Sequence, residues 1–206
     1  ALNETSGDIE KATDWLRKNG INTAQKKSGR SASDGLITID TIEKKGIIVE
    51  VNSETDFVAK NDNFQNFCKM VASICIDNEI NSLDILMESK FDKDTLVKDE
   101  LTNLVSKLGE NIVIRRLNFI FQDENYIQTY IHNSVSEKSG KIGVIISYSV
   151  TNNTEEVKTF SKQIAMHIAA LDPKSMDVDS LDPNLVNRER EIFTEQLSSS
   201  GKPPEI

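Results

Sequence analysis

The chain contains 206 residues, of which 37% are hydrophobic and 28% are charged, with 9 Gly and 4 Pro. This composition excludes a collagen, a low-complexity disordered chain and a disulfide-stapled miniprotein, and no apolar run approaches the roughly 20 residues of a membrane helix. The 24 basic and 33 acidic residues give a net charge of −9, which would repel a phosphate backbone. We therefore expect a soluble protein with neither a membrane nor a nucleic acid as its partner.

The first predicted element is a short amphipathic helix over residues 7–19. Asp8 is placed to cap its N-terminus, and Gly20 is expected to end it. The apolar side chains recur at helical spacing and form one stripe, which consists of Ile9, Ala12, Trp15 and Leu16. Residues 22–34 are polar and basic, with glycine and serine among them, and we predict a linker over residues 21–34.

A β-hairpin is predicted from residue 35 onward. Runs of β-branched and other apolar residues flank the segment 43–46, which contains a turn glycine. A connector over residues 52–60 leads into a helix for which Asp62 and Gln65 have capping-box spacing. The buried face predicted for this helix carries Phe64, Phe67, Cys68, Val71 and Cys75.

Both cysteines lie on that predicted helix, seven residues apart. Seven residues of α-helix span roughly 10.5 Å, whereas the Cα atoms of a disulfide lie within about 7 Å of each other. We therefore expect Cys68 and Cys75 to be free thiols packed in the core, which suits a reducing cytosol.

The second half of the chain follows a similar plan of strands and amphipathic helices. The predicted elements are a helix over about 94–108 that Gly109 stops, strands within 112–121, 126–132 and 142–150, and helices over about 155–170 and from about 183. The pattern Phe-x-Lys-x-(Val/Ile)-Ala occurs at Phe67 and again at Phe160. We therefore predict an α+β fold with two similar subdomains, each an antiparallel hairpin or sheet packed on helices. One side of the 155–170 helix is predicted to collect Val157, Phe160, Ile164, Ile168 and Leu171.

Motifs for covalent chemistry are missing from the sequence. It contains no phosphate-binding glycine loop and no nucleophile elbow. His132 and His167 lie far apart, and neither has a cysteine neighbour in a zinc-ligand pattern. We expect no enzymatic activity, no cofactor and no metal site. His132 falls on the polar face of its predicted strand, near the strand end, whereas His167 is expected at the edge of the core.

The connector segment Thr55-Asp-Phe-Val58 is an unusual local feature. Phe57 follows a polar run and precedes the next helix. It can be interpreted as a core-facing staple before a capped helix, or as an exposed apolar wedge that marks a partner site. Local sequence physics favours the staple.

Residues 51–64, which include Thr55-Asp-Phe-Val-Ala-Lys60, resemble the elongation factor Ts family, the nucleotide exchange factors of translation elongation factor Tu. Other blocks resemble the family in the right order and extend the resemblance over essentially the whole chain: 7–12 with 15–18, 109–116, 164–170 and 200–206. The family acts by binding, without covalent chemistry, which fits the missing catalytic motifs.

The resemblance also implies roles for individual residues. The element that disturbs the Mg²⁺ and phosphate sites of the GTPase, so that GDP leaves, corresponds to Thr55, Asp56, Phe57 and Val58. Phe57 is then the wedge, which reverses the preference for the staple. Leu108 and Gly109 match positions at a helix end that face the GTPase, and His132 matches a histidine that meets a more distal domain of that partner.

The domain organisation expected from the residues and the resemblance has five parts. These are a remnant of a ubiquitin-associated-like helical domain (1–20), a linker (21–34), an N-terminal core subdomain (35–124), a C-terminal core subdomain (125–174) and the first half of a helical coiled-coil arm (175–206). The chain is then a fragment that lacks part of the N-terminal domain and the C-terminal segment, from the bacterial cytoplasm or an organellar matrix. A homodimer could form through the terminal helix. The alternative interpretations are a ubiquitin-associated-like adaptor and an acidic scaffold or chaperone.

Overall fold

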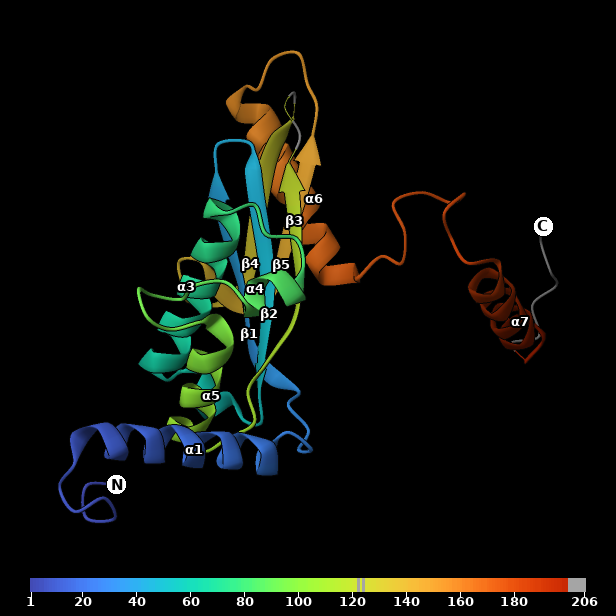
Figure 1. The fold of residues 1–206 in the computed structure, drawn as a ribbon. Helices are drawn as coiled ribbons and strands as arrows, with labels where there is room; N and C mark the ends of the chain where they lie inside the picture. The colour runs from blue at the N-terminus through green and yellow to red at the C-terminus, as the bar shows by residue number, and fades with distance from the viewer. Residues whose placement is uncertain (122, 124, 200–206) are drawn as a thin grey trace. The chain divides into compact units, whose positions relative to one another are not determined.

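The computed structural model describes residues 1–121, 123 and 125–199 (Figure 1). The chain divides into two units, Ala1–Ala169 and Ala170–Ile206. The first unit contains the β-sheet and the helices packed on it, and the second contains the last helix. Within the described ranges, no helix is both long enough and apolar enough to cross a membrane.

The described strands form one antiparallel sheet of five, in the order β3-β2-β1-β5-β4. They are β1 (Asp34–Ile42), β2 (Lys45–Ser53), β3 (Val113–Phe121), β4 (Tyr126–Ser136) and β5 (Ser139–Tyr148). β1 and β2 form the predicted hairpin, paired along the whole of both strands. β5 pairs with β1 at Ile37 and Thr38, so strands from both predicted subdomains share one sheet. The α+β class predicted from the sequence is confirmed.

Beyond that short pairing, β5 passes across one face of the β1–β2 hairpin. A Cβ on Gly143 of β5 would lie 2.5 Å from the Ile37 side chain and 3.3 Å from that of Ile48. A Cβ on Gly46 of β2 would lie 2.3 Å from the side chain of Ile145 in β5. At Gly143, where three isoleucine side chains surround the position, glycine allows the strands to approach closely. The sheet therefore folds into two layers of strands.

Helix α3 (Asp62–Asp77) covers the other face of the hairpin, on the side where Figure 1 shows α3 and α5. The five side chains predicted to face inward are all buried, which confirms the predicted face. Phe67 stacks on Phe91, with the ring centroids 5.6 Å apart. The predicted capping residue was wrong by one position: the N-cap is Asn61, whose side chain accepts a hydrogen bond from the backbone N–H of Asn63 at 2.9 Å.

Two further helices, α4 (Leu83–Met87) and α5 (Val97–Leu108), complete this core. Gly109 ends α5 with a φ of 74°, a left-handed conformation that favours glycine, so the predicted stop is confirmed. The two cysteines are free and buried, as expected. Burial raises the pKa of the Cys75 thiol to about 12 and also raises the pKa of Cys68, so neither thiol is reactive at neutral pH.

Helix α1 (Ile9–Lys27) is longer than the sequence predicts, because Gly20 does not end it. Gly20 is buried and faces α5, where a Cβ would lie 3.8 Å from the side chain of Ser106. This packing outweighs the cost of about 1 kcal/mol for glycine inside a helix. Residues 21–27 of the predicted linker are therefore helical. The predicted stripe was also wrong, since Ala12 is buried but Ile9 and Leu16 are exposed.

The core face predicted for the 155–170 helix was wrong for helix α6 (Glu155–Leu171). The buried residues are Ser161 and Ala165, whereas Phe160 and Leu171 are 62% and 63% exposed. The Ser161 hydroxyl lies 3.5 Å from Oε1 of Gln128 in β4. Of the five side chains predicted to face inward, Val157 and Ile168 are half-buried, whereas Phe160, Ile164 and Leu171 are exposed. The histidine expected at the core edge, at position 167, is exposed as well.

Helix α7 (Pro183–Ser199) lies in the second unit, and none of its described residues is buried. Its start at residue 183 agrees with the sequence prediction. Its large apolar side chains include Ile192 and Phe193, with 37% and 60% of their surfaces exposed. The end of the predicted arm, residues 200–206, lies outside the described residues.

Amide hydrogen exchange is expected to be faster in residues 185–197 than in α6 when the protein is a dilute monomer. An isolated helix of this length is marginal in water, whereas α6 has two buried side chains to hold it. Exchange monitored by mass spectrometry would measure this. Equal protection of the two helices would contradict the prediction, and protection of α7 that rises with protein concentration would support a homodimer through this helix.

Candidate partner-binding surface

The segment after β2 forms a single helical turn, α2 (Asp56–Ala59), with Thr55 as its N-cap. Val58 and Ala59 point into the core, with 7% and 1% of their surfaces exposed, whereas Phe57 is 77% exposed. The staple interpretation of Phe57 is therefore wrong, because Val58 and Ala59 supply the inward anchors. An aromatic side chain this exposed is unusual on a soluble protein and marks a candidate interaction site.

Two charged neighbours flank the exposed ring. The Lys60 ammonium lies 3.0 Å from Oδ2 of Asp56 and 5.9 Å from the centroid of the Phe57 ring. An exposed ion pair of this kind contributes little to stability, about 0–1 kcal/mol. The surface around Phe57 is therefore apolar at its centre and polar at its rim, which is the usual anatomy of a protein interface.

A pair of carboxylates ties this turn to the segment between α5 and β3. The backbone N–H of Thr55 donates to Oε2 of Glu110 at 3.0 Å, and the Thr55 hydroxyl donates to Oε1 at 2.6 Å. In the reverse direction, the backbone N–H of Asn111 donates to Oε1 of Glu54 at 2.6 Å. We call these four residues the clasp. Sequence analysis missed it, because no local pattern links positions so far apart in the chain.

Leu108 and Gly109, the second predicted contact segment, stand directly before the clasp. Leu108 is half-buried against the core and Gly109 is exposed, with open space around the position of a Cβ. The Gly109 carbonyl accepts a hydrogen bond from the Lys27 ammonium of α1, and the Lys107 ammonium donates to Asn63 of α3 at 2.8 Å. The end of α5 is thereby joined to α1, to α3 and, through the clasp, to α2.

His132 lies apart from this group. It is exposed on β4, and the strand order places β1 and β5 between β4 and β2. Its Nδ1 lies 2.9 Å from the hydroxyl of Tyr130, two residues earlier on the same face. The structure therefore brings positions 55–58 together with Leu108 and Gly109 but leaves His132 as a separate surface point.

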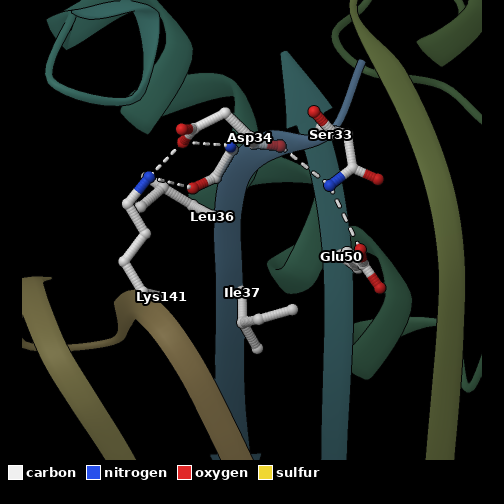
Figure 2. Close-up of a pocket in the computed structure, with 8 residues that line it drawn as sticks. Ser33, Asp34, Leu36, Ile37, Glu50 and Lys141 are labelled. Atoms are coloured by element: carbon white, nitrogen blue, oxygen red, sulfur yellow. Dashed lines mark hydrogen bonds and ion pairs between the residues drawn. The ribbon is translucent and has the colours of Figure 1, made fainter. Parts of the chain in front are cut away.

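A polar hollow of about 250 Å³ opens beside the first strands (Figure 2). Lys141 reaches from β5 to the Asp34 carboxylate and donates to the Gly35 carbonyl at 3.2 Å. The Asn52 amide donates to the Asp34 carbonyl at 2.8 Å and to Glu50 at 3.1 Å. The hydrogen bond from Lys141 is the main cause that lowers the pKa of the Asp34 carboxyl. These polar groups form hydrogen bonds and an ion pair with one another, so we interpret the hollow as a structural contact between strands β1, β2 and β5.

Among the described residues, no cluster of His, Cys, Asp and Glu could hold a metal ion.

An anchored turn that exposes an aromatic ring on an α+β core is typical of proteins that act by binding another protein. The family model described as Elongation factor TS matches residues 54–206, a range that includes Phe57, Glu110 and His132. The chain belongs to the elongation factor Ts family.

Curated relatives extend the match over the whole chain. It is 42% identical over 206 residues to elongation factor Ts of Beijerinckia indica and 43% identical over 207 residues to that of Methylobacterium sp. strain 4-46, and both alignments cover 100% of this chain. Elongation factor Ts of Bartonella henselae is 41% identical over 207 residues, again with 100% of this chain covered. The chain spans 66% of the length of the first two relatives and 67% of the third.

Proposed function

We propose that this chain is part of a guanine nucleotide exchange factor of translation elongation, which binds elongation factor Tu in its GDP form and promotes the release of GDP. The observation that carries this proposal is the exposed Phe57 on an anchored turn, within the range that matches the family model. The factor acts by binding alone, without catalytic residues or a cofactor of its own.

The proposed mechanism uses Phe57 as a wedge. Phe57 enters the nucleotide-binding domain of the GTPase with Asp56 and disturbs the sites of Mg²⁺ and the phosphates. Thr55 and Val58 hold the turn, which fits the hydrogen bonds of Thr55 and the burial of Val58. A space that closes around bound GDP cannot hold the wedge as well, so the factor and GDP weaken each other's binding by the same factor. GTP then binds the emptied site and displaces the factor.

Leu108 and Gly109 are proposed to contact the same domain, because the clasp holds them beside the wedge. His132 is proposed to meet a second, more distal domain of the GTPase, which fits its separate place on β4. For the domain organisation we propose a ubiquitin-associated-like remnant, two core subdomains and a helical arm. We also propose a cytoplasmic location, since the compared relatives are bacterial elongation factors.

Gel filtration with purified elongation factor Tu tests this proposal. We expect the two proteins to co-elute without nucleotide and the complex to dissociate when GDP and Mg²⁺ are added. Co-elution that GDP leaves unchanged would contradict nucleotide exchange, and the absence of a complex under every condition would favour an acidic scaffold or an adaptor.

Replacing His132 with alanine is expected to weaken binding to elongation factor Tu by roughly tenfold or less, since one contact at the edge of an interface contributes on the order of 1 kcal/mol. The folded state should be unchanged, because the side chain is exposed and bonds with Tyr130 alone among the described hydrogen bonds. Titration calorimetry of both variants gives the affinities. Equal affinity would remove His132 from the contact surface.

A further inference from the structure

The position of the Phe57 ring depends on the backbone of a very short element. Helix α2 has four residues, and a helix of this length is not stable on its own. The ring is 77% exposed, so packing within this chain does little to fix it. The anchors of the α2 backbone therefore decide where the ring points before a partner arrives.

The first turn of α2 lacks its local cap. A helix N-cap usually accepts a hydrogen bond through its own side chain, and a glutamate three residues later often returns one to the backbone N–H of the cap. Here the Thr55 side chain makes no such bond, and Val58 occupies the position of the glutamate. Glu110 replaces that residue from 55 positions away and accepts from both the N–H and the hydroxyl of Thr55.

The other two residues of the clasp, Glu54 and Asn111, make this contact more rigid. The Glu54 carboxylate accepts from the backbone of Asn111, which is 6% exposed and whose side chain donates to the Arg30 carbonyl at 2.7 Å. The Arg30 guanidinium lies 3.6 Å from Glu54. Hydrogen bonds to ionised carboxylates are stronger than those between neutral groups. The segment at 54–55 and the segment at 110–111 each supply a carboxylate that accepts hydrogen bonds from the other, so their relative position is fixed.

We propose that Glu110 is a positioning residue for nucleotide release, which holds the Phe57 turn and the Leu108–Gly109 turn as one preformed surface. This inference rests on the proposed exchange function. Glu110 acts through Thr55 and is half-buried, so its role differs from that of a contact residue. A preformed surface spares the ordering of both segments when the partner binds, which leaves more of the binding free energy for displacing GDP.

Stopped-flow release of a fluorescent GDP from elongation factor Tu, at increasing concentrations of the chain, tests the inference. Glu110→Ala is expected to lower the maximal rate about tenfold, as loss of hydrogen bonds to a carboxylate would. The half-saturating concentration should change by less than about threefold, because the remaining contacts still form. Glu110→Gln keeps one acceptor oxygen and should recover part of the rate. The amide of Thr55 should exchange faster in Glu110→Ala than in the unchanged chain.

Matched controls separate the outcomes. Glu88→Gln removes a different carboxylate, an exposed one that pairs with Lys98 at 2.6 Å, and should leave the rate unchanged. Rates are expressed per folded molecule after thermal melts. If the unchanged chain accelerates release and Glu110→Ala matches it per folded molecule, the positioning role is overturned while exchange stands. If the unchanged chain does not accelerate release, the proposed function itself fails.

Discussion

Replacing Phe57 with alanine is expected to remove most of the acceleration of GDP release while leaving the stability of the free chain nearly unchanged. The side chain is 77% exposed and is flanked mainly by Lys60, so its loss costs little in the folded chain. At the centre of an interface, by contrast, an aromatic anchor contributes about 2 kcal/mol or more. That free energy corresponds to a fall of about 30-fold in the rate of release.

Two measurements on the same samples decide this prediction. Stopped-flow release of fluorescent GDP gives the rate, and a thermal melt of the free chain gives the stability. A loss of several kcal/mol in stability, with the rate per folded molecule intact, would show that Phe57 supports the fold and is no wedge.

Replacing Phe64 with alanine is expected to have the opposite signature. Phe64 lies in the first turn of α3 and is fully buried, with 0% of its surface exposed. Removing a buried phenylalanine side chain costs about 3–5 kcal/mol, because apolar contacts are lost and a cavity remains. This is a large part of the 5–15 kcal/mol that typically stabilises a domain.

Urea or thermal unfolding of the Phe64→Ala variant gives the change in stability, and stopped-flow release gives the rate per folded molecule, which should match that of the unchanged chain. The two variants form a matched pair, since the same atoms are removed from an exposed and from a buried site. A Phe64→Ala variant with an unchanged unfolding midpoint would contradict the packing of α3 described above.

Features that depend on local spacing could be predicted from the sequence. The inward face of α3 follows from apolar residues at helical spacing, and the end of α5 follows from Gly109, whose left-handed conformation few other residues adopt. The β1–β2 hairpin follows from two apolar runs around a short turn. In each of these cases the local preference and the tertiary packing favour the same structure.

Features that depend on contacts between distant segments could not be predicted. Gly20 lies inside α1 because α5 packs against it. In α6 the buried side chains are the small Ser161 and Ala165, while Phe160 and Leu171 are exposed, and the spacing of apolar residues does not reveal this.

The candidate site divides in the same way. The sequence singled out Phe57 as unusual, but local physics favoured a buried staple, because spacing does not tell which of Phe57 and Val58 faces inward. The resemblance to a family reversed that preference, and the exposure of Phe57 agrees with the reversal. The role of Glu110 could not be predicted from the sequence, because Thr55 lies 55 positions away and only the fold brings the two residues together.

We propose that binding of this chain and binding of GDP to elongation factor Tu oppose each other. The affinity of elongation factor Tu for GDP, measured by titration with and without a saturating concentration of the chain, tests it most directly. We expect GDP to bind more weakly when the chain is present, by the same factor by which GDP weakens the complex. A GDP affinity that stays unchanged while the complex is fully formed would show that the chain is no exchange factor.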